Sequence, residues 1–358
     1  VRVGLSPSAV FHGLNNLMRE VLLASCSGRL VDSSTLPEGL WDAIQSNGPT
    51  QACLQSLRDT IAAIDAELRY EIYLSVYGTT SARLLFGASG FEIYEPPEAV
   101  KTELNKFVVH LFERTSKLVG ITKACGETVM DHYLRYSADL APGNGNVCGM
   151  CATEQLAQRQ SNVPAVDQWR SPYDHLLAKD TYPQFGVDPD NLLPICHTCN
   201  SKAKLAKDLL RSPAGLRRTC FDPWSESAHG QVSLQVSFLG ILPKATWTIV
   251  PTNPINQRKL TTWNDVYRIK ERVEGEFLSL REKLAEDLQL ENLTLFKISI
   301  NNKAREKITY ARLTPHNYWR SLLYSSLLLL PDQHLEQLRT LCLAGLDPNG
   351  DSAATYGV

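Results

Sequence analysis

The sequence has no long hydrophobic run and no large excess of either charge. Its most apolar stretch, 321–330, is about ten residues long, whereas a helix that spans a bilayer needs about 20. We therefore expect no membrane span. Lys plus Arg number 36 and Asp plus Glu 38, which gives a formal net charge of −2. A protein that binds nucleic acid along its whole length is usually basic, so any such binding here must be local or shared with a partner.

The chain also lacks the features of a secreted protein. Its start shows no basic patch followed by an apolar core, and its nine cysteines are an odd number that does not suit a framework of disulfides. We therefore expect a protein of the reducing cytoplasm. Hydrophobic residues make up 43% and charged residues 21% of the chain, values typical of a globular protein. Its 358 residues are enough for two or three domains.

The hydrophobic pattern predicts a mixed α+β fold that begins with helices. Apolar residues at steps of three or four from Leu54 to Ile72 indicate one helix, which ends at Gly78. A second helix is predicted after Pro97, because apolar residues again recur on one face up to Leu111.

The second half of the chain is expected to contain both strands and helices. Alternating apolar residues in 232–238 and an apolar segment at 247–250 predict two strands. A long amphipathic helix is predicted for 263–288. Two further helices, separated by Pro331, are predicted within 315–344.

Four of the nine cysteines form two Cys-x-x-Cys pairs, whereas the others are isolated and are expected to be small buried apolar residues. Two such pairs can bind one tetrahedral zinc ion through four thiolates, which leaves no open position for water. The zinc would therefore stabilise the fold and take no part in catalysis. The alternative is a chance arrangement among many cysteines. The expected zinc ligands are Cys148, Cys151, Cys196 and Cys199.

The segment between the two pairs carries residues suited to chemistry. Strand-like residues precede and follow a loop through 179–189, and helical spacing follows at 200–211. A hairpin followed by a helix would bring Asp174, His175 and Asn200 into one crevice. A histidine with an ordinary pKa near 6.5 is largely neutral at pH 7–8, so His175 can accept a proton from water.

These residues resemble the HNH endonucleases, also called His-Me finger or ββα-metal nucleases. The likeness depends on Asp174-His175, on Asn191-Leu192, on Cys199-Asn200 and on the cysteine pairs that bracket the motif. A longer string of matches is similar to bacterial HNH proteins of antiphage systems, such as the nuclease subunits of Septu and retron-associated modules. One position departs from the family pattern, since Ala178 stands where many members have proline.

The resemblance implies a ββα-metal core with a structural four-cysteine zinc site. We expect a helical N-terminal region at 1–105, which the resemblance does not cover and which is a possible docking region for a partner. The HNH nuclease domain with its zinc site is expected at 106–220, and a mixed, mainly helical α+β region at 221–358.

The resemblance also implies a role for each site residue. His175 would be the general base, and Asn191 would brace the loop that orients it. Asp174 and the Asn200 side-chain carbonyl would hold a catalytic Mg²⁺ or Mn²⁺, since such cations prefer oxygen ligands. The products would carry 5′-phosphate and 3′-hydroxyl ends. Each residue also has a structural alternative: a hydrogen-bonded strand histidine, a turn aspartate and a helix N-cap asparagine.

Basic residues gather in two places, on the predicted nuclease helix and in the stretch 296–320, where aromatic residues lie among them. Such surfaces suit contacts to the phosphate backbone without base readout, although a solvated helical face gives the same pattern. The predicted nucleic-acid contacts are Lys202, Lys204, Lys207, Lys303, Arg305 and Lys307.

The sequence thus predicts a zinc-stabilised, Mg²⁺- or Mn²⁺-dependent DNA endonuclease that acts in bacterial antiphage defence. By the same resemblance, an ATPase subunit of such a system would be its partner, whereas the oligomeric state stays open. Two alternatives differ from this prediction. One is a non-catalytic, zinc-stabilised module that binds DNA or acts as a scaffold. The other is a nuclease that acts on RNA, because the motif contacts phosphates and not sugars.

Overall fold

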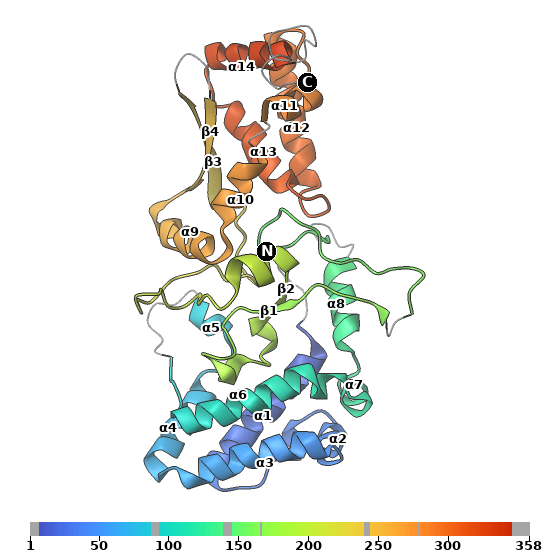
Figure 1. Cartoon of the computed structure of the whole chain (residues 1–358), viewed down its shortest axis with the longest axis vertical. Coiled ribbons are helices and arrows are strands. Elements are labelled where there is room, and N and C mark those ends of the chain that lie inside the picture. Colours follow the sequence, from blue (N-terminus) through green and yellow to red (C-terminus); the bar gives the residue numbers. More distant parts are fainter. Residues whose placement is uncertain are drawn as a thin grey trace. The chain divides into compact units, whose positions relative to one another are not determined.

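The chain forms two compact units, one of residues 1–139 with 157–226 and the other of residues 140–156 with 227–358. Among the described residues, most of the structure is helical and two small antiparallel sheets are present, so the α+β class is confirmed. No helix in this part of the chain has the length and apolar character needed to cross a membrane. Figure 1 shows the computed structural model, which describes residues 7–86, 93–138, 145–164, 167–239, 244–277 and 280–345.

The first unit is built around α1 (Ala9–Ser27), whose inward-facing apolar residues are buried. This helix packs against other helices of the same unit (Figure 1), among them α3 (Gly48–Ala63), α4 (Ala66–Gly78) and α6 (Glu98–Glu113). Shorter helices in the described part of this unit are α2 (Leu40–Gln45), α5 (Arg83–Phe86), α7 (Val119–Cys125) and α8 (Val129–Ala138).

Two helical predictions fall in the first unit, and they have different outcomes. The helix predicted after Pro97 is confirmed as α6. The single helix predicted from Leu54 to Gly78 is wrong, because α3 and α4 occupy this segment. The break lies at Asp65, whose side chain accepts a hydrogen bond from Leu68 N at 2.8 Å and so caps the start of α4.

The predicted hairpin also lies in the first unit. Its strands, β1 (Tyr173–His175) and β2 (Leu192–Pro194), pair antiparallel, with His175 opposite Leu192. The loop between them contains two short 3-10 turns, η4 (Pro183–Phe185) and η5 (Pro189–Asn191).

The helix predicted at 200–211 is shorter than expected. It is a single stretch of π-helix, η6 (Cys199–Lys204), and it ends where Leu205 has a positive φ of 53°. Beyond this point Asp208 Oδ1 accepts a hydrogen bond from Leu210 N at 2.7 Å, which holds the chain in a turn.

The described part of the second unit combines a sheet with helices. The two predicted strands are confirmed as β3 (Val232–Leu239) and β4 (Lys244–Pro251), which pair antiparallel. The helices of this part are α9 (Pro254–Tyr267), α10 (Ile269–Glu276), α11 (Leu280–Asp287), α12 (Leu293–Thr309), α13 (Asn317–Leu327) and α14 (Asp332–Gly345).

The long helix predicted for 263–288 is wrong, because the segment is divided among α9, α10 and α11. The first break is at Arg268, whose φ of 54° is left-handed and ends α9. Residues 278–279 of this prediction lie outside the described residues. The two helices predicted around Pro331 are confirmed as α13 and α14.

Candidate functional site

His175 is the last residue of β1, and the loop of the hairpin holds its half-buried ring. His175 Nε2 lies 2.9 Å from the carbonyl oxygen of Gly186. Because a carbonyl oxygen can only accept, Nε2 donates its proton, and Nδ1 carries the lone pair of the neutral ring. Phe112 of α6 packs against the ring at a steep angle, with 4.7 Å between the ring centroids. One ring nitrogen therefore stays able to accept a proton.

The surroundings of His175 keep this ring uncharged. Its pKa is lowered to about 4, chiefly by burial and to a smaller extent by the cations Lys179 and Lys204. The Gly186 carbonyl and the Asp174 carboxylate act in the opposite direction but do not outweigh burial. At neutral pH, His175 is therefore a neutral hydrogen-bond acceptor at Nδ1.

Gly186 supplies the acceptor for His175 because the loop approaches α6 closely at this point. A Cβ atom at Gly186 would lie 2.1 Å from Val108 Cγ1, a distance at which two carbon atoms cannot coexist. The φ of Gly186 is −70°, so the contact and not the backbone conformation requires glycine here. No local pattern marks Gly186 as important, since nothing in the sequence shows which helix the loop contacts.

Asn191 lies where it connects the two ends of the hairpin loop. Its fully buried side chain accepts a hydrogen bond from Leu177 N at 2.7 Å. It also donates to Leu177 O at 3.0 Å and to Phe185 O at 2.9 Å. The amide thus ties the end of the loop to its start at Leu177 and to Phe185, the residue before Gly186, which carries the acceptor of His175.

The loop is also attached to a distant part of the first unit through two acidic residues. Asp188 Oδ2 accepts a hydrogen bond from Ala82 N at 2.7 Å, and Ser81 Oγ donates to Asp190 Oδ2 at 2.7 Å. Asp188 is buried, and burial raises its pKa to about 6. These contacts join residues more than 100 positions apart, and the sequence contains no signal for them.

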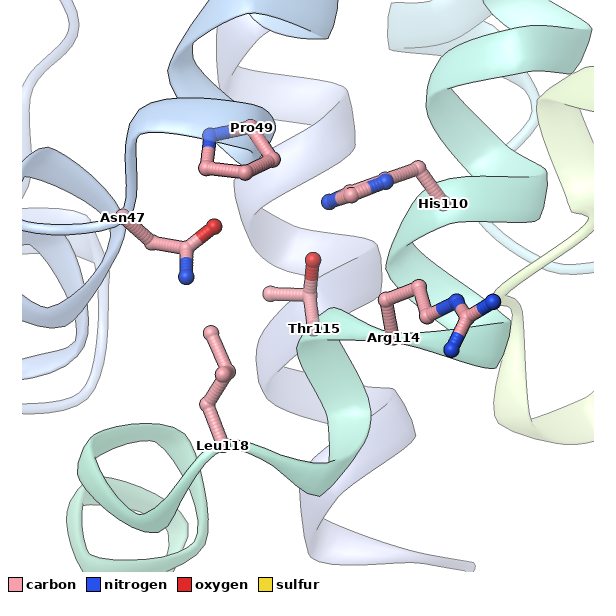
Figure 2. Close-up of a pocket in the computed structure, with 6 residues that line it drawn as sticks. All are labelled: Asn47, Pro49, His110, Arg114, Thr115 and Leu118. Carbon is pink, nitrogen blue, oxygen red and sulfur yellow. The ribbon is translucent and has the colours of Figure 1, made fainter.

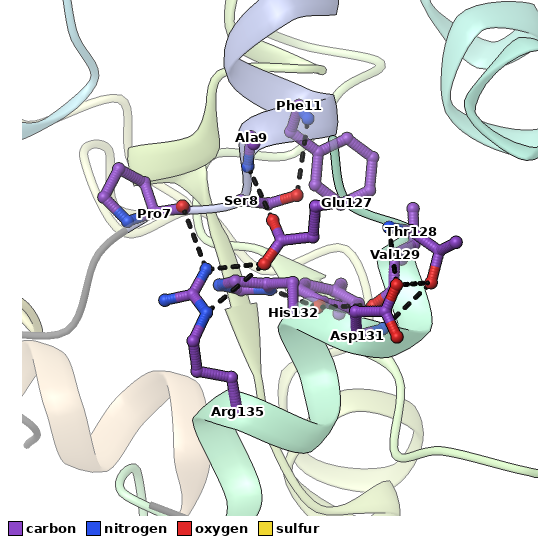
Figure 3. Close-up of polar contacts among 11 residues, drawn as sticks. Pro7, Ser8, Ala9, Phe11, Glu127, Thr128, Val129, Asp131, His132 and Arg135 are labelled. Atoms are coloured by element: carbon purple, nitrogen blue, oxygen red, sulfur yellow. Dashed lines mark hydrogen bonds and ion pairs between the residues drawn. The ribbon is translucent and has the colours of Figure 1, made fainter. Parts of the chain in front are cut away.

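The start of β1 contacts α1 and α8, since the Phe11 ring of α1 lies 5.5 Å from the Tyr173 ring, centroid to centroid, and polar contacts also join the starts of α1 and α8 (Figure 3). Glu127 accepts a hydrogen bond from Ala9 N at 2.8 Å and forms an ion pair with Arg135 at 2.8 Å. His132 Nδ1 lies 2.5 Å from the hydroxyl oxygen of Tyr173, the first residue of β1. Both helices therefore help to place the strand that carries Asp174 and His175.

Asp174 and His175 have partners on different sides of the hairpin, as expected for neighbouring residues of a strand. Lys204 of η6 lies 2.6 Å from Asp174 Oδ1 and also donates to the His175 carbonyl oxygen. The Lys204 and Asp174 side chains are only 2% and 3% exposed. The ammonium group of Lys204, predicted to contact nucleic acid, is thus buried in an ion pair.

Asp174 and Asn200, the two residues predicted to hold Mg²⁺ or Mn²⁺, each have a partner within the first unit. The half-buried Asn200 amide donates to Ser201 Oγ at 3.4 Å. The Lys204 ammonium lies 2.6 Å from Asp174 Oδ1, so a divalent cation at this oxygen would have to displace a buried cation. These two residues in their described arrangement therefore fit a divalent cation poorly.

The four cysteines of the two pairs gather into one cluster, as predicted. Their sulfur atoms all lie within 4.8 Å of one another, and all four residues are buried. A tetrahedral zinc with Zn–S bonds of about 2.3 Å would place its ligands roughly 3.8 Å apart. Among the described residues, this is the only group of three or more His, Cys, Asp or Glu suited to a metal. The cluster could bind a metal such as zinc.

Local hydrogen bonds prepare one sulfur of each pair to act as a thiolate. Thr153 donates to Cys151 Sγ from its backbone N at 3.4 Å and from its hydroxyl group at 3.2 Å. In the second pair, Cys199 N donates to Cys196 Sγ at 3.4 Å. Donors directed at sulfur favour its charged form, which is the form that binds metal.

The other predicted nucleic-acid contacts have different surroundings. Lys202, Lys207 and Arg305 are exposed. Lys307, by contrast, is buried, with its ammonium 3.7 Å from both Asp287 and Glu306. The Lys307 charge is thus partly balanced within the second unit.

Lys303 is also close to acidic residues of the second unit. Its ammonium group lies 3.0 Å from the Glu306 carboxylate and 3.8 Å from that of Asp287. Of the aromatic residues in the stretch 296–320, Tyr310 is exposed and Trp319 is fully buried. The stretch 296–320 therefore offers less free positive charge than its sequence indicates.

Comparisons with profiles of protein families, with curated proteins and with solved structures found no match. The site is therefore interpreted from its own geometry and chemistry.

Proposed function

We propose that the chain is an HNH-type endonuclease that hydrolyses phosphodiester bonds in DNA, with His175 as its general base. The observation that most directly supports this is the 2.9 Å hydrogen bond between His175 Nε2 and the Gly186 carbonyl. It leaves Nδ1 with its lone pair, and a pKa lowered to about 4 keeps the ring neutral at pH 7. A water molecule next to Nδ1 would have a base within reach.

In the proposed reaction, water transfers a proton to His175 Nδ1 as its oxygen attacks phosphorus. The bond from phosphorus to the 3′ oxygen breaks, and this oxygen takes a proton from solvent water, which yields the 5′-phosphate and 3′-hydroxyl ends that the HNH resemblance implies. A base with a pKa of about 4 is weak. The negative charge of a nearby phosphate raises that pKa, so substrate binding would strengthen the base.

We also propose that the four-cysteine cluster holds zinc in a structural role. Four thiolates fill a tetrahedral coordination sphere and leave no position for water. The HNH resemblance further implies Mg²⁺ or Mn²⁺ at Asp174 and Asn200. Because the Lys204 ammonium lies 2.6 Å from Asp174 Oδ1, no step of the proposed reaction is assigned to a divalent cation.

A second candidate is a non-catalytic module that is stabilised by zinc and binds DNA or acts as a scaffold. The buried ion pair between Lys204 and Asp174 supports it, because such a pair gives Asp174 a purely structural role. Under this alternative, His175 would also be a structural residue, held between Gly186 and Phe112.

The cellular role is proposed from the same resemblance. The protein would be the effector nuclease of a bacterial antiphage system in the cytoplasm, with an ATPase subunit as its partner. An apolar stripe on α4 in the N-terminal region supports a partner, because Tyr70, Leu74 and Tyr77 are 61%, 48% and 67% exposed. Exposed apolar groups on one helix face often mark contacts with another protein.

The test is a cleavage assay with the purified full chain. Supercoiled plasmid, linear duplex DNA and single-stranded RNA are each incubated with Mg²⁺, with Mn²⁺ and with EDTA, and the ends of any products are analysed. Cleavage of DNA with 5′-phosphate ends is the expected result. Cleavage of RNA alone would contradict the choice of DNA, and no cleavage under any condition would favour the non-catalytic module.

A further inference from the structure

Arg170, three residues before β1, is a half-buried cation with few partners. Its guanidinium carbon lies 4.7 Å from the centre of the Tyr173 ring, and its Nη1 donates to the Ser171 carbonyl oxygen at 3.3 Å. It forms no ion pair with any residue that the structure describes. Burial lowers its pKa, and no carboxylate of the described residues counteracts this effect. Because charged side chains are rarely buried without a counterion, Arg170 lacks the partner that its position calls for.

One edge of this guanidinium group is open. Nε and Nη2 have no hydrogen-bond partner among the described residues, and neither atom is closed off from solvent. These two nitrogens present parallel N–H groups, which match two oxygens of one phosphate. The Tyr173 ring and the Ser171 carbonyl oxygen already hold the group in place, so little conformational freedom is lost when an anion binds.

Arg114, at the end of α6, lacks this support. It borders a cavity of about 300 Å³ and also forms no ion pair with a described residue. Its side chain is exposed, and Figure 2 shows that its guanidinium group points away from the cavity. No described aromatic ring or carbonyl oxygen holds this group, so Arg114 is not preorganised for an anion as Arg170 is.

The Arg170 guanidinium lies on the face of β1 that carries His175. Tyr173 and His175 are two residues apart in a strand, so their side chains share one face, at positions about 7 Å apart. Ring contacts connect them, since Phe11 lies 5.5 Å from Tyr173 and 5.4 Å from Phe112, centroid to centroid. Phe112 in turn lies 4.7 Å from His175. A nucleic-acid strand that places one phosphate at His175 can therefore bring another phosphate to Arg170.

We propose that Arg170 binds a phosphate of the DNA strand close to the phosphate on which His175 acts. The inference rests on the proposed nuclease function, and it makes Arg170 a binding residue that touches no reacting bond. The preceding residue supports nucleic acid as the source of the phosphate. The Trp169 side chain is 57% exposed, and an exposed indole can stack on an unpaired base.

The test measures binding of fluorescein-labelled single-stranded and duplex DNA to the full chain, by fluorescence anisotropy in EDTA at several salt concentrations. Arg170→Met removes the charge but keeps an apolar stem against Tyr173. Arg170→Lys keeps the charge but not the parallel N–H groups. Arg58→Met is the matched control, because Arg58 is a half-buried arginine without an ion pair among the described residues. Figure 1 shows α3, which carries Arg58, on the far side of α6 from β1.

Arg170→Met should weaken binding about tenfold, as expected for the loss of a charged hydrogen-bond donor. It should also lower the salt slope, the change in log Kd with log salt, by about 0.7 for the single strand, the effect of one lost phosphate contact. Arg170→Lys should keep this slope and lose part of the affinity, and Arg58→Met should bind as the wild type does. The midpoint of thermal unfolding of Arg170→Met should not fall, because no ion pair is lost.

Equal affinity and equal salt slope for Arg170→Met and the wild type would overturn the inference, as would a wild-type chain that binds neither DNA. A lower unfolding midpoint with unchanged DNA binding would give Arg170 a structural role alone and also overturn it. The nuclease function is measured separately, by cleavage. A chain that binds DNA through Arg170 but does not cleave it would contradict the nuclease function and support the phosphate contact.

Discussion

The ammonium group of Lys204 lies inside the first unit, next to the Asp174 carboxylate and the His175 carbonyl oxygen. Removal of one partner from a buried ion pair leaves the other charge uncompensated, which costs about 3–5 kcal/mol. We therefore expect Lys204→Met to lower the free energy of unfolding by about this amount. Lys202→Met, at an exposed lysine of the same helix, should change it by less than about 0.5 kcal/mol.

Urea unfolding followed by circular dichroism measures both variants. The double variant Asp174→Leu/Lys204→Met removes both charges and should be more stable than Lys204→Met alone. Similar stabilities of Lys204→Met and Lys202→Met would show that the ion pair is not buried as described.

Asp188 and His175 of the first unit titrate in opposite senses. The pKa of Asp188 is raised to about 6, so between about pH 4 and 6 the folded protein binds more protons at Asp188 than the unfolded chain, and stability falls as the pH rises. The pKa of His175 is lowered to about 4, so the unfolded chain binds more protons there, and stability rises with pH over nearly the same range.

Asp188→Asn should remove the contribution to the free energy of unfolding that falls as the pH rises. The contribution of His175, which increases with pH, should stay. The slope of the unfolding free energy against pH should then become more positive, by up to about 1.4 kcal/mol per pH unit. Urea unfolding of the two proteins at several pH values between about 4 and 6 measures this slope. An unchanged slope would mean that Asp188 is ionised in the folded protein throughout this range.

Among the single elements, the two turns that contain the Cys-x-x-Cys pairs are the local structures that the sequence predicts most directly. Because each turn presents sulfur atoms that accept N–H or O–H donors, we expect one zinc ion per chain. Cys196→Ser should lose this zinc together with much of the stability of the fold, since metal binding and folding are linked. Cys26→Ser, at an isolated cysteine of α1, should keep its zinc.

Elemental analysis of the purified proteins, together with thermal unfolding before and after addition of a chelator, measures both effects. Zinc-free wild-type protein, or full zinc content in Cys196→Ser, would contradict the assignment of this cluster.

The sequence predicted elements well where one amphipathic pattern belongs to one helix, as in α6, α13 and α14. It failed where a cap or a left-handed residue divides a continuous pattern. Asp65 separates α3 from α4, and Arg268 with a φ of 54° separates α9 from α10. Apolar periodicity shows which face of a helix is buried. It does not show a break between two helices when the apolar pattern continues across that break.

At the scale of the whole molecule, the candidate site depends on contacts that join distant parts of the chain. Strand residues Asp174 and His175 and the bracing Asn191 could be predicted, because a short motif contains them. The partners that fix them could not be predicted. Ala82 N bonds to Asp188, and Phe11 of α1 packs 5.5 Å from Tyr173, centroid to centroid. Such pairings are set by tertiary packing and leave no local pattern.

This dependence makes the N-terminal helices part of the unit that carries the hairpin. A chain that begins at residue 93 lacks α1, α3 and α4, and with them Phe11 and the Ala82 donor to Asp188. We expect this truncated chain to lose cooperative unfolding and the near-ultraviolet circular dichroism signal of packed aromatic residues. Thermal unfolding with an unchanged midpoint would instead show that these helices form a separate domain.

The central claim is that His175 is the general base of a nuclease, and one pair of variants tests it. His175→Ala and His12→Ala, a control at an exposed histidine of α1, are compared with the wild type in a DNA cleavage assay at equal concentration, after thermal unfolding has confirmed that both are folded. If His175 is the base, His175→Ala loses about 10²–10⁴-fold in cleavage rate while His12→Ala keeps the wild-type rate. A folded His175→Ala variant that cleaves DNA at the wild-type rate would show that His175 is not the general base.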